Sequence, residues 1–209
     1  MEPAAVLSSD SHVFEPPDLW TTRIDPAFRH RAPRMQRIDG ADQLVVEAGQ
    51  VLSGIGLISN AGARFDAPET ISSLARFEDV HRGGYDPDQH LADMRLDGVA
   101  GEVLYPSQGL FYFKVQDPAL MSAIFRAYND WLAEFCRRDP ARLKGIAMVN
   151  LDDVADGIRE LERAARLGLA GAMITEYPLE HRRYDQPEYE PFWAAAASLG
   201  MPLSLHTAT

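Results

Sequence analysis

A carboxylate and an imidazole lie two residues apart near the amino terminus, at Asp10 and His12. They follow an apolar stretch, residues 4–7, that reads as a first strand. Side chains at alternate positions of an extended segment point to the same face, so these two groups converge if the strand continues. A carboxylate oxygen and an imidazole nitrogen are two of the ligands that a divalent metal ion needs. A capped strand end with a surface histidine has the same residues, so this pair alone is a weak signal.

A second histidine ends a strand pattern near the other end of the sequence. His206 closes the short apolar segment 201–206. A metal site therefore requires the intervening chain to bring the first and last strands together.

From residue 86 onward the sequence alternates between helical and strand patterns. An Asp, a Pro or both stand where each helix is predicted to start, as is typical of a first helical turn. The helices are predicted at about 87–96, 118–135, 154–165 and 187–199, and apolar strands follow at 99–105, 144–149, 171–175 and 201–206. With the first strand, this gives five strands and four helices. Such alternation predicts parallel strands joined by crossover helices, in an open doubly wound sheet or in part of an eight-stranded barrel.

Functional groups gather at the carboxyl ends of the strands in both of these folds. Tyr105 and Ser107, at the end of the second strand, are candidates to line a pocket. Glu176, at the end of the fourth strand, either faces the mouth of the barrel or is a surface carboxylate. Glu15, just after the first strand, either supports the metal ligands or caps its loop. We take these four as candidate substrate-binding residues. No phosphate loop or Gly-x-Gly-x-x-Gly motif supports a nucleotide site.

The segment 16–87 is an insertion with little periodicity. We expect a hairpin around Gly49 and a short helix across 68–77. Five arginines lie between residues 23 and 37. The arginines either hold a substrate carboxylate or form solvated surface charge. The lone histidines outside the strand ends, His81 and His90 among them, are expected to be exposed. A long loop-rich insertion of this kind is often a lid over a site.

The composition excludes several classes of protein. Acidic residues exceed basic ones by 31 − 20 = 11, which disfavours nucleic acid and anionic membranes as partners. No apolar run approaches the roughly 20 residues of a membrane span. Cys136 is the only cysteine, which we expect to be a buried inert thiol. The amino terminus lacks the features of a signal peptide, so a cytoplasmic location is expected.

Several motifs together resemble the amidohydrolase-related proteins, especially those like aminocarboxymuconate-semialdehyde decarboxylase. The resemblance covers nearly the whole chain outside the insertion. It lies in Ser9–Pro16, Asp93-Met94 with Asp97–Val99, Val103–Ser107, Ala127–Phe135, Asp139–Gly145, Leu167–Ala172 and Leu203–His206.

The resemblance implies a metal-dependent (β/α)8 TIM barrel, present here as one incomplete domain over 1–209 with the insertion at about 16–87. It makes Asp10, His12 and His206 metal ligands, with Zn²⁺ expected and Mn²⁺ as the alternative. It places the acid/base residue and a further ligand beyond residue 209, so no catalytic residue is assigned here.

The activity expected from the resemblance is non-oxidative decarboxylation of a small carboxylic acid. Hydrolysis of a C–N or C–O bond in an amide or ester is the first alternative, and an inactive truncated form is the second. A homodimer is left open.

Overall fold

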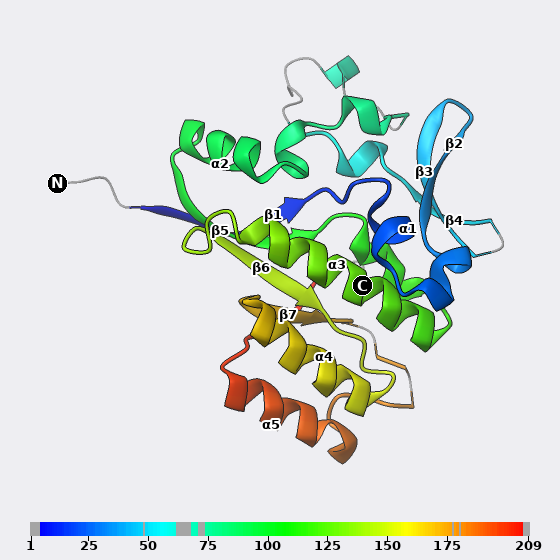
Figure 1. Cartoon of the computed structure of the whole chain (residues 1–209), viewed down its shortest axis with the longest axis vertical. Helices are drawn as coiled ribbons and strands as arrows, with labels where there is room; N and C mark the ends of the chain where they lie inside the picture. The colour runs from blue at the N-terminus through cyan, green and yellow to red at the C-terminus, as the bar shows by residue number, and fades with distance from the viewer. Residues whose placement is uncertain are drawn as a thin grey trace.

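A parallel sheet of five strands forms the body of the protein (Figure 1). The computed structural model describes residues 5–47, 49–61, 68–70, 74–176, 178–179 and 181–206. The strands lie in the order in which they occur in the sequence: β1 (Val6–Val13), β5 (Val99–Pro106), β6 (Leu143–Met148), β7 (Gly171–Ile174) and β8 (Leu203–Leu205). An order without reversal lacks the switch point of a doubly wound sheet, and it is the order of a barrel.

Each crossover between neighbouring strands contains a helix. These are α2 (Pro87–Leu96), α3 (Pro118–Cys136), α4 (Val154–Leu167) and α5 (Glu190–Leu199). The side chains of Asp86, Asp117 and Asp153 accept backbone N–H groups at the first three helix starts, as the sequence predicts for Asp86 and Asp117. Gly168 and Gly200 end α4 and α5 with φ of 88° and 64°, a conformation that glycine adopts without strain.

The sheet is strongly curved. Strands β5 and β8 are separated by two others, which in a flat sheet would place them roughly 14 Å apart. The hydroxyl of Tyr105 on β5 nevertheless lies 2.8 Å from Oγ of Ser204 on β8. Curvature of this degree is that of a barrel wall, so the described strands form a partial TIM barrel, as predicted.

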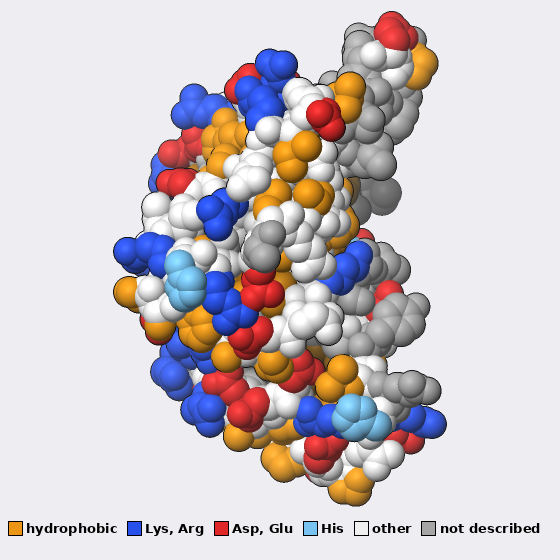
Figure 2. All heavy atoms as spheres, turned by 90° about the vertical axis from the view of Figure 1, so that its right-hand side faces the viewer, with side chains coloured by type: hydrophobic (Ala, Val, Ile, Leu, Met, Phe, Trp, Pro, Cys, Tyr) orange, Lys and Arg blue, Asp and Glu red, His pale blue; other side chains and the backbone are white. Residues whose placement is uncertain are grey.

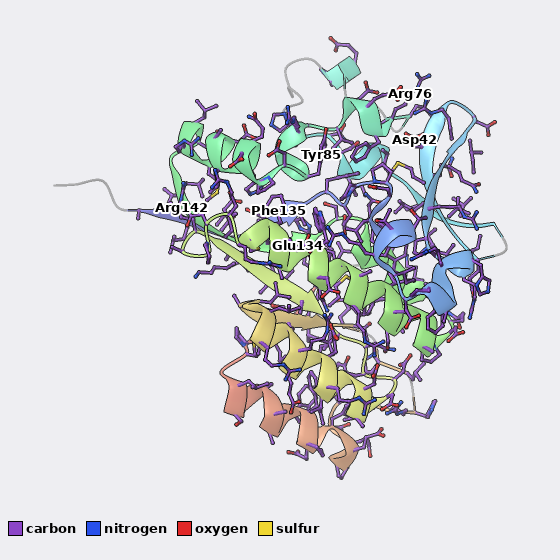
Figure 3. All side chains as sticks on the ribbon, in the orientation of Figure 1. Asp42, Arg76, Tyr85, Glu134, Phe135 and Arg142 are labelled. Atoms are coloured by element: carbon purple, nitrogen blue, oxygen red, sulfur yellow. The ribbon has the colours of Figure 1, made fainter. Side chains whose placement is uncertain are left out.

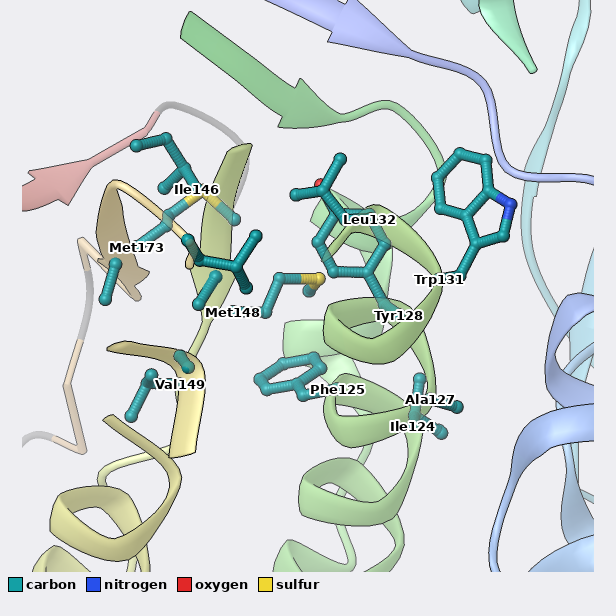
Figure 4. Close-up of a cluster of buried hydrophobic side chains, with 14 of the residues drawn as sticks. Ile124, Phe125, Ala127, Tyr128, Trp131, Leu132, Ile146, Met148, Val149 and Met173 are labelled. Carbon is teal, nitrogen blue, oxygen red and sulfur yellow. The ribbon is translucent and has the colours of Figure 1, made fainter. Parts of the chain in front are cut away.

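Helix α3 supplies the largest part of the core (Figure 4). Its buried residues Phe125, Tyr128 and Leu132 pack beside Ile146 and Met148 of β6. Cys136 is also buried here, and burial raises the pKa of its thiol to about 12. The apolar residues that recur at helical spacing from Leu120 to Phe135 therefore form an apolar stripe that faces the core.

The insertion contains regular structure that the sequence only partly predicted. The hairpin is confirmed as β3 (Ala41–Val46) and β4 (Gln50–Gly54), but β2 (Arg34–Ile38) joins it as a third antiparallel strand. A helix across 68–77 is not found: 3-10 turns occupy Pro68–Thr70 and Phe77–Asp79, and residues 71–73 lie outside the described residues.

The remaining short elements are one helix and several 3-10 turns. They are α1 (Leu19–Arg23), η1 (Pro26–Arg31), η2 (Gly56–Ile58), η5 (Arg82–Gly84), η6 (Gly109–Lys114) and η7 (Pro187–Tyr189). Within the described part of the chain, no helix has both the length and the apolar character needed to cross a membrane.

Asn129 connects α3 to two neighbouring elements inside this core. Its amide accepts the Met148 N–H at 2.8 Å and donates to the Met148 carbonyl and to Glu160 of α4. Replacing it with alanine leaves buried polar groups without partners, at about 1–3 kcal/mol for each such group.

We predict that Asn129→Ala lowers the free energy of unfolding by about 3 kcal/mol, measured by urea denaturation. Glu162→Ala, at an exposed position of α4, is the control and should change it by less than about 0.5 kcal/mol. Equal effects of the two substitutions would contradict a structural role of this network.

Candidate metal centre

Three side chains from the two ends of the sheet meet in one place. Ligand atoms of Asp10, His12 and His206 all lie within 4.8 Å of one another. Nε2 of His12 lies 3.4 Å from Oδ1 of Asp10, and Nε2 of His206 lies 3.5 Å from the same oxygen. The two imidazole rings are 5.2 Å apart and nearly perpendicular. The sequence-based expectation that these residues converge is therefore met in the structure.

The geometry of β1 differs from the expected strand end. The strand continues to Val13, so Asp10 and His12 lie within it and not after it. They still share a face, and the pairing with β5 is irregular between Ser8 and Ser11. This irregularity lies beside Asp10, at the point where the two ligands project.

A backbone carbonyl determines which nitrogen of His12 is available. Nδ1 of His12 lies 2.8 Å from the carbonyl oxygen of Pro106. A carbonyl only accepts, so Nδ1 carries the proton and the neutral ring presents an unprotonated Nε2 toward Asp10 and His206. Metal-binding histidines typically donate their other ring nitrogen in this manner. The donor set of one carboxylate and two imidazoles thus fits a divalent ion.

Tyr105 lies next to both histidines. Its ring centroid is 5.2 Å from that of His206 and 6.1 Å from that of His12. Its hydroxyl is engaged with Ser204. Among the contacts of the described residues, Tyr105 is a candidate substrate-binding residue that lies against the candidate metal ligands, and its role in binding substrate stays a prediction.

The other three candidates lie in different surroundings. Ser107 is buried after β5, and Glu176 follows β7. Glu15 is fully enclosed, and its carboxylate oxygens accept the N–H groups of Gln108 and Gly109 at 2.9 and 2.8 Å. The loop-capping alternative for Glu15 is the geometry observed.

Several arginines of the insertion form ion pairs with carboxylates. Arg31 pairs with Glu47 and Asp117, and Arg37 pairs with Asp42 and Glu78. Figure 2 shows basic and acidic side chains interspersed over one face of the molecule. These two arginines therefore stabilise the insertion and its contact with α3.

A cavity of about 460 Å³ lies beside Asp10 and His12. It is lined in part by two histidine–carboxylate pairs: His81 with Asp93, and His90 with Glu102, each at 2.7 Å. His90 was expected to be exposed, but it is largely buried between α2 and β5. Burial opposes its protonation, yet the Glu102 carboxylate and the Gly83 carbonyl raise its pKa overall. Sequence spacing gives no signal of this pair because its members come from different elements.

The burial of Glu15 has a consequence for stability against pH. Burial, partly opposed by the backbone N–H groups, raises its pKa from 4.5 to about 7. Between these pH values the folded state keeps a proton that the unfolded state has released, so the free energy of unfolding falls as the pH rises.

We predict that the contribution of Glu15 to the free energy of unfolding falls by about 3 kcal/mol between pH 4.5 and 7 and is then constant. The measurement is the difference in unfolding free energy between the original protein and Glu15→Gln, which cannot titrate. A difference that does not change with pH would show that Glu15 has an ordinary pKa.

Comparison with known proteins places this geometry in a family. A family model described as amidohydrolase matches residues 86–209. A gamma-resorcylate decarboxylase from Rhizobium radiobacter is 37% identical over 155 residues, which cover 68% of this chain and 47% of that protein.

Solved structures show the same fold. An amidohydrolase from Mycobacterium avium subsp. paratuberculosis K-10 superposes with a TM-score of 0.77 at 22% identity, over 97% of this chain and 58% of that one. A dihydroxybenzoic acid decarboxylase from Polaromonas sp. JS666 was solved with manganese and the inhibitor 2-nitroresorcinol. It superposes with a TM-score of 0.57 at 21% identity, over 97% of this chain and 49% of that one.

The chain spans about half the length of the relatives it matches. The family model covers more than half of this chain, including the last strand and His206. The chain belongs to the amidohydrolase family.

Proposed function

We propose that the whole protein is a metal-dependent, non-oxidative decarboxylase of a small aromatic carboxylic acid. The observation that carries this proposal is the convergence of Asp10, His12 and His206 within 4.8 Å. The decarboxylases that the chain resembles act, by their names, on gamma-resorcylate and dihydroxybenzoic acid. A hydroxybenzoate is therefore the substrate class to test.

The described residues have distinct parts in this proposal. Asp10, His12 and His206 hold the metal, and the Pro106 carbonyl keeps His12 in the tautomer that binds it. A bound metal ion would polarise the substrate carboxylate and stabilise charge as CO2 leaves. The Tyr105 ring borders the two histidines and offers an apolar edge to an aromatic substrate. Proton transfer stays assigned to residues beyond 209, as the family resemblance implies.

The identity of the metal has two candidates. Mixed carboxylate and imidazole ligands are typical of Zn²⁺, which is the ion expected from the sequence. The Polaromonas decarboxylase was solved with manganese, which supports Mn²⁺. We propose a divalent ion at this site and leave the choice to elemental analysis of the native protein.

We predict that His12→Ala and His206→Ala each reduce the bound Zn or Mn at least tenfold, because each removes one ligand atom. Inductively coupled plasma mass spectrometry measures the metal content. His30→Ala, an exposed histidine on η1, is the matched control and should keep the metal. Unchanged metal in both site variants would exclude these ligands.

Hydrolysis is the second candidate function. It is supported by the matching family model, which is described as amidohydrolase. The same three ligands would serve either reaction, since a bound metal also lowers the pKa of water.

The two activities are separated by their products. We predict CO2 release from 2,6-dihydroxybenzoate by the metal-loaded whole protein, with a loss of at least about 100-fold in His206→Ala. The measurement runs in parallel with ester and amide substrates of similar size. Hydrolysis of these without CO2 release would favour the second candidate, and neither product would favour a non-catalytic role.

Further proposals concern the location of the protein, its partners and its domain organisation. We propose a cytoplasmic protein that binds neither nucleic acid nor membrane, since its net charge of −11 repels phosphate. We also propose that the chain forms a single barrel domain, that 16–87 is a lid, and that the protein is a homodimer. Ala61, Gly83 and Gly84 of the insertion do line the cavity beside Asp10 and His12, which supports the lid.

A further inference from the structure

The buried carboxylate of Glu15 is three residues from the proposed metal ligand His12. None of its side chain is exposed to solvent. Enclosing a carboxylate costs free energy unless hydrogen bonds compensate for lost water. Its two oxygens accept N–H groups from two consecutive residues, Gln108 and Gly109. The Glu15 carboxylate therefore joins its own loop to the segment that contains Gln108 and Gly109.

The contact between these two loops is reciprocal. The Gln108 side chain, also fully buried, donates from Nε2 to the backbone carbonyl of Glu15 at 2.5 Å. We call these three hydrogen bonds the Glu15 bridge. The bridge joins the loop after β1 to the loop after β5, and both loops come directly from the strands that bear the site.

The Glu15 bridge closes a ring that contains His12. Gln108 is two residues after Pro106, whose carbonyl oxygen accepts a hydrogen bond from Nδ1 of His12 at 2.8 Å. Pairing of β1 with β5 aligns His12 with Tyr105 and Val13 with Pro106. The ring thus runs from His12 along the chain to Glu15, across to Gln108, back to Pro106, and across again to His12.

We propose that Glu15 is a positioning residue: through the Glu15 bridge it sets the direction of the Pro106 carbonyl and thereby the tautomer and orientation of His12. The proposal of a metal site at Asp10, His12 and His206 underlies the functional part of this inference. The structural part, the tautomer of His12, can be measured without any metal.

The test compares Glu15→Gln with the original protein at pH 8. The substituted amide presents a donor where one oxygen accepted an N–H, so one bond of the Glu15 bridge is lost. Imidazole nitrogen chemical shifts, assigned with His12→Asn, report the tautomer in the metal-free protein. We expect His12 to be protonated at Nδ1 in the original protein and to contain a substantial Nε2-protonated fraction in Glu15→Gln.

Metal affinity is the second measurement. Mn²⁺ is the probe, and electron paramagnetic resonance of the free ion gives its Kd. We expect a Kd about 10-fold higher in Glu15→Gln, the lower end of what loss of a supporting hydrogen bond costs a metal site.

Asp42→Asn is the matched control. Asp42, labelled in Figure 3, is a buried carboxylate on β3. It accepts the Phe77 N–H and pairs with Arg37. It belongs to the antiparallel sheet and not to the ring around His12. Both substitutions replace a buried carboxylate by its amide, but only Glu15→Gln should change the tautomer and the Kd.

A second variant covers the case in which Glu15→Gln does not fold. Gln108→Met keeps the shape and the Glu15 carboxylate but removes the bond to the Glu15 carbonyl. We expect smaller changes of the same kind, about 3-fold in Kd, because the lost bond joins two neutral groups and both bonds to the Glu15 carboxylate remain.

The outcomes separate this inference from the proposed function. An unchanged His12 tautomer in Glu15→Gln, or in Gln108→Met if the first does not fold, overturns the positioning role whether or not metal binds. A changed tautomer without any Mn²⁺ binding by the original protein supports positioning and refutes Mn²⁺ as the ion of the proposed site. Equal effects of Glu15→Gln and Asp42→Asn on the Kd reduce Glu15 to a stabilising residue.

Discussion

The curvature of the parallel sheet is the constraint on which the candidate site depends. His12 lies on β1 and His206 directly follows β8, and a flat sheet of five strands would hold these two edge strands roughly 19 Å apart. Their ring centroids are 5.2 Å apart. The buried face of α3 against β6 and the crossover helices that follow it stabilise this curved arrangement. A local change in the core between β6 and β8 therefore acts on the site without touching any ligand.

Backbone groups as well as side chains hold the candidate site in place. The Pro106 carbonyl orients His12, and Tyr105, the residue before it, reaches across to Ser204 on β8. One short stretch at the end of β5 thus contacts both edge strands. Because β5 pairs directly with β1, it is well placed to transmit the position of one edge to the other.

Periodicity and capping residues were sufficient to predict the repeating part of the fold. Asp117-Pro118 marks the start of α3, and the apolar stripe that follows identifies its core face, because both signals are local in sequence. The strand β2 and helix α1 were missed, since Arg34–Ile38 and Leu19–Arg23 have mixed composition and are ordered by tertiary contacts. The extent of β1 was underestimated because Ser8–His12 is polar, although pairing with β5 holds it in the strand.

The convergence of Asp10, His12 and His206 could be predicted because they lie in the carboxyl-terminal half of the first strand or just after the last one, and barrel topology brings these parts together. The environment of Glu15 and His90 could not, because their partners Gln108 and Glu102 belong to other elements, and only the register of β1 with β5 and the packing of α2 bring them together. Glu15 illustrates the difference. Its residue type suggests an exposed ligand or substrate contact, whereas its complete burial and backbone partners indicate a group that orients its neighbours. A residue near a metal motif can thus matter for the chemistry while remaining out of reach of the substrate.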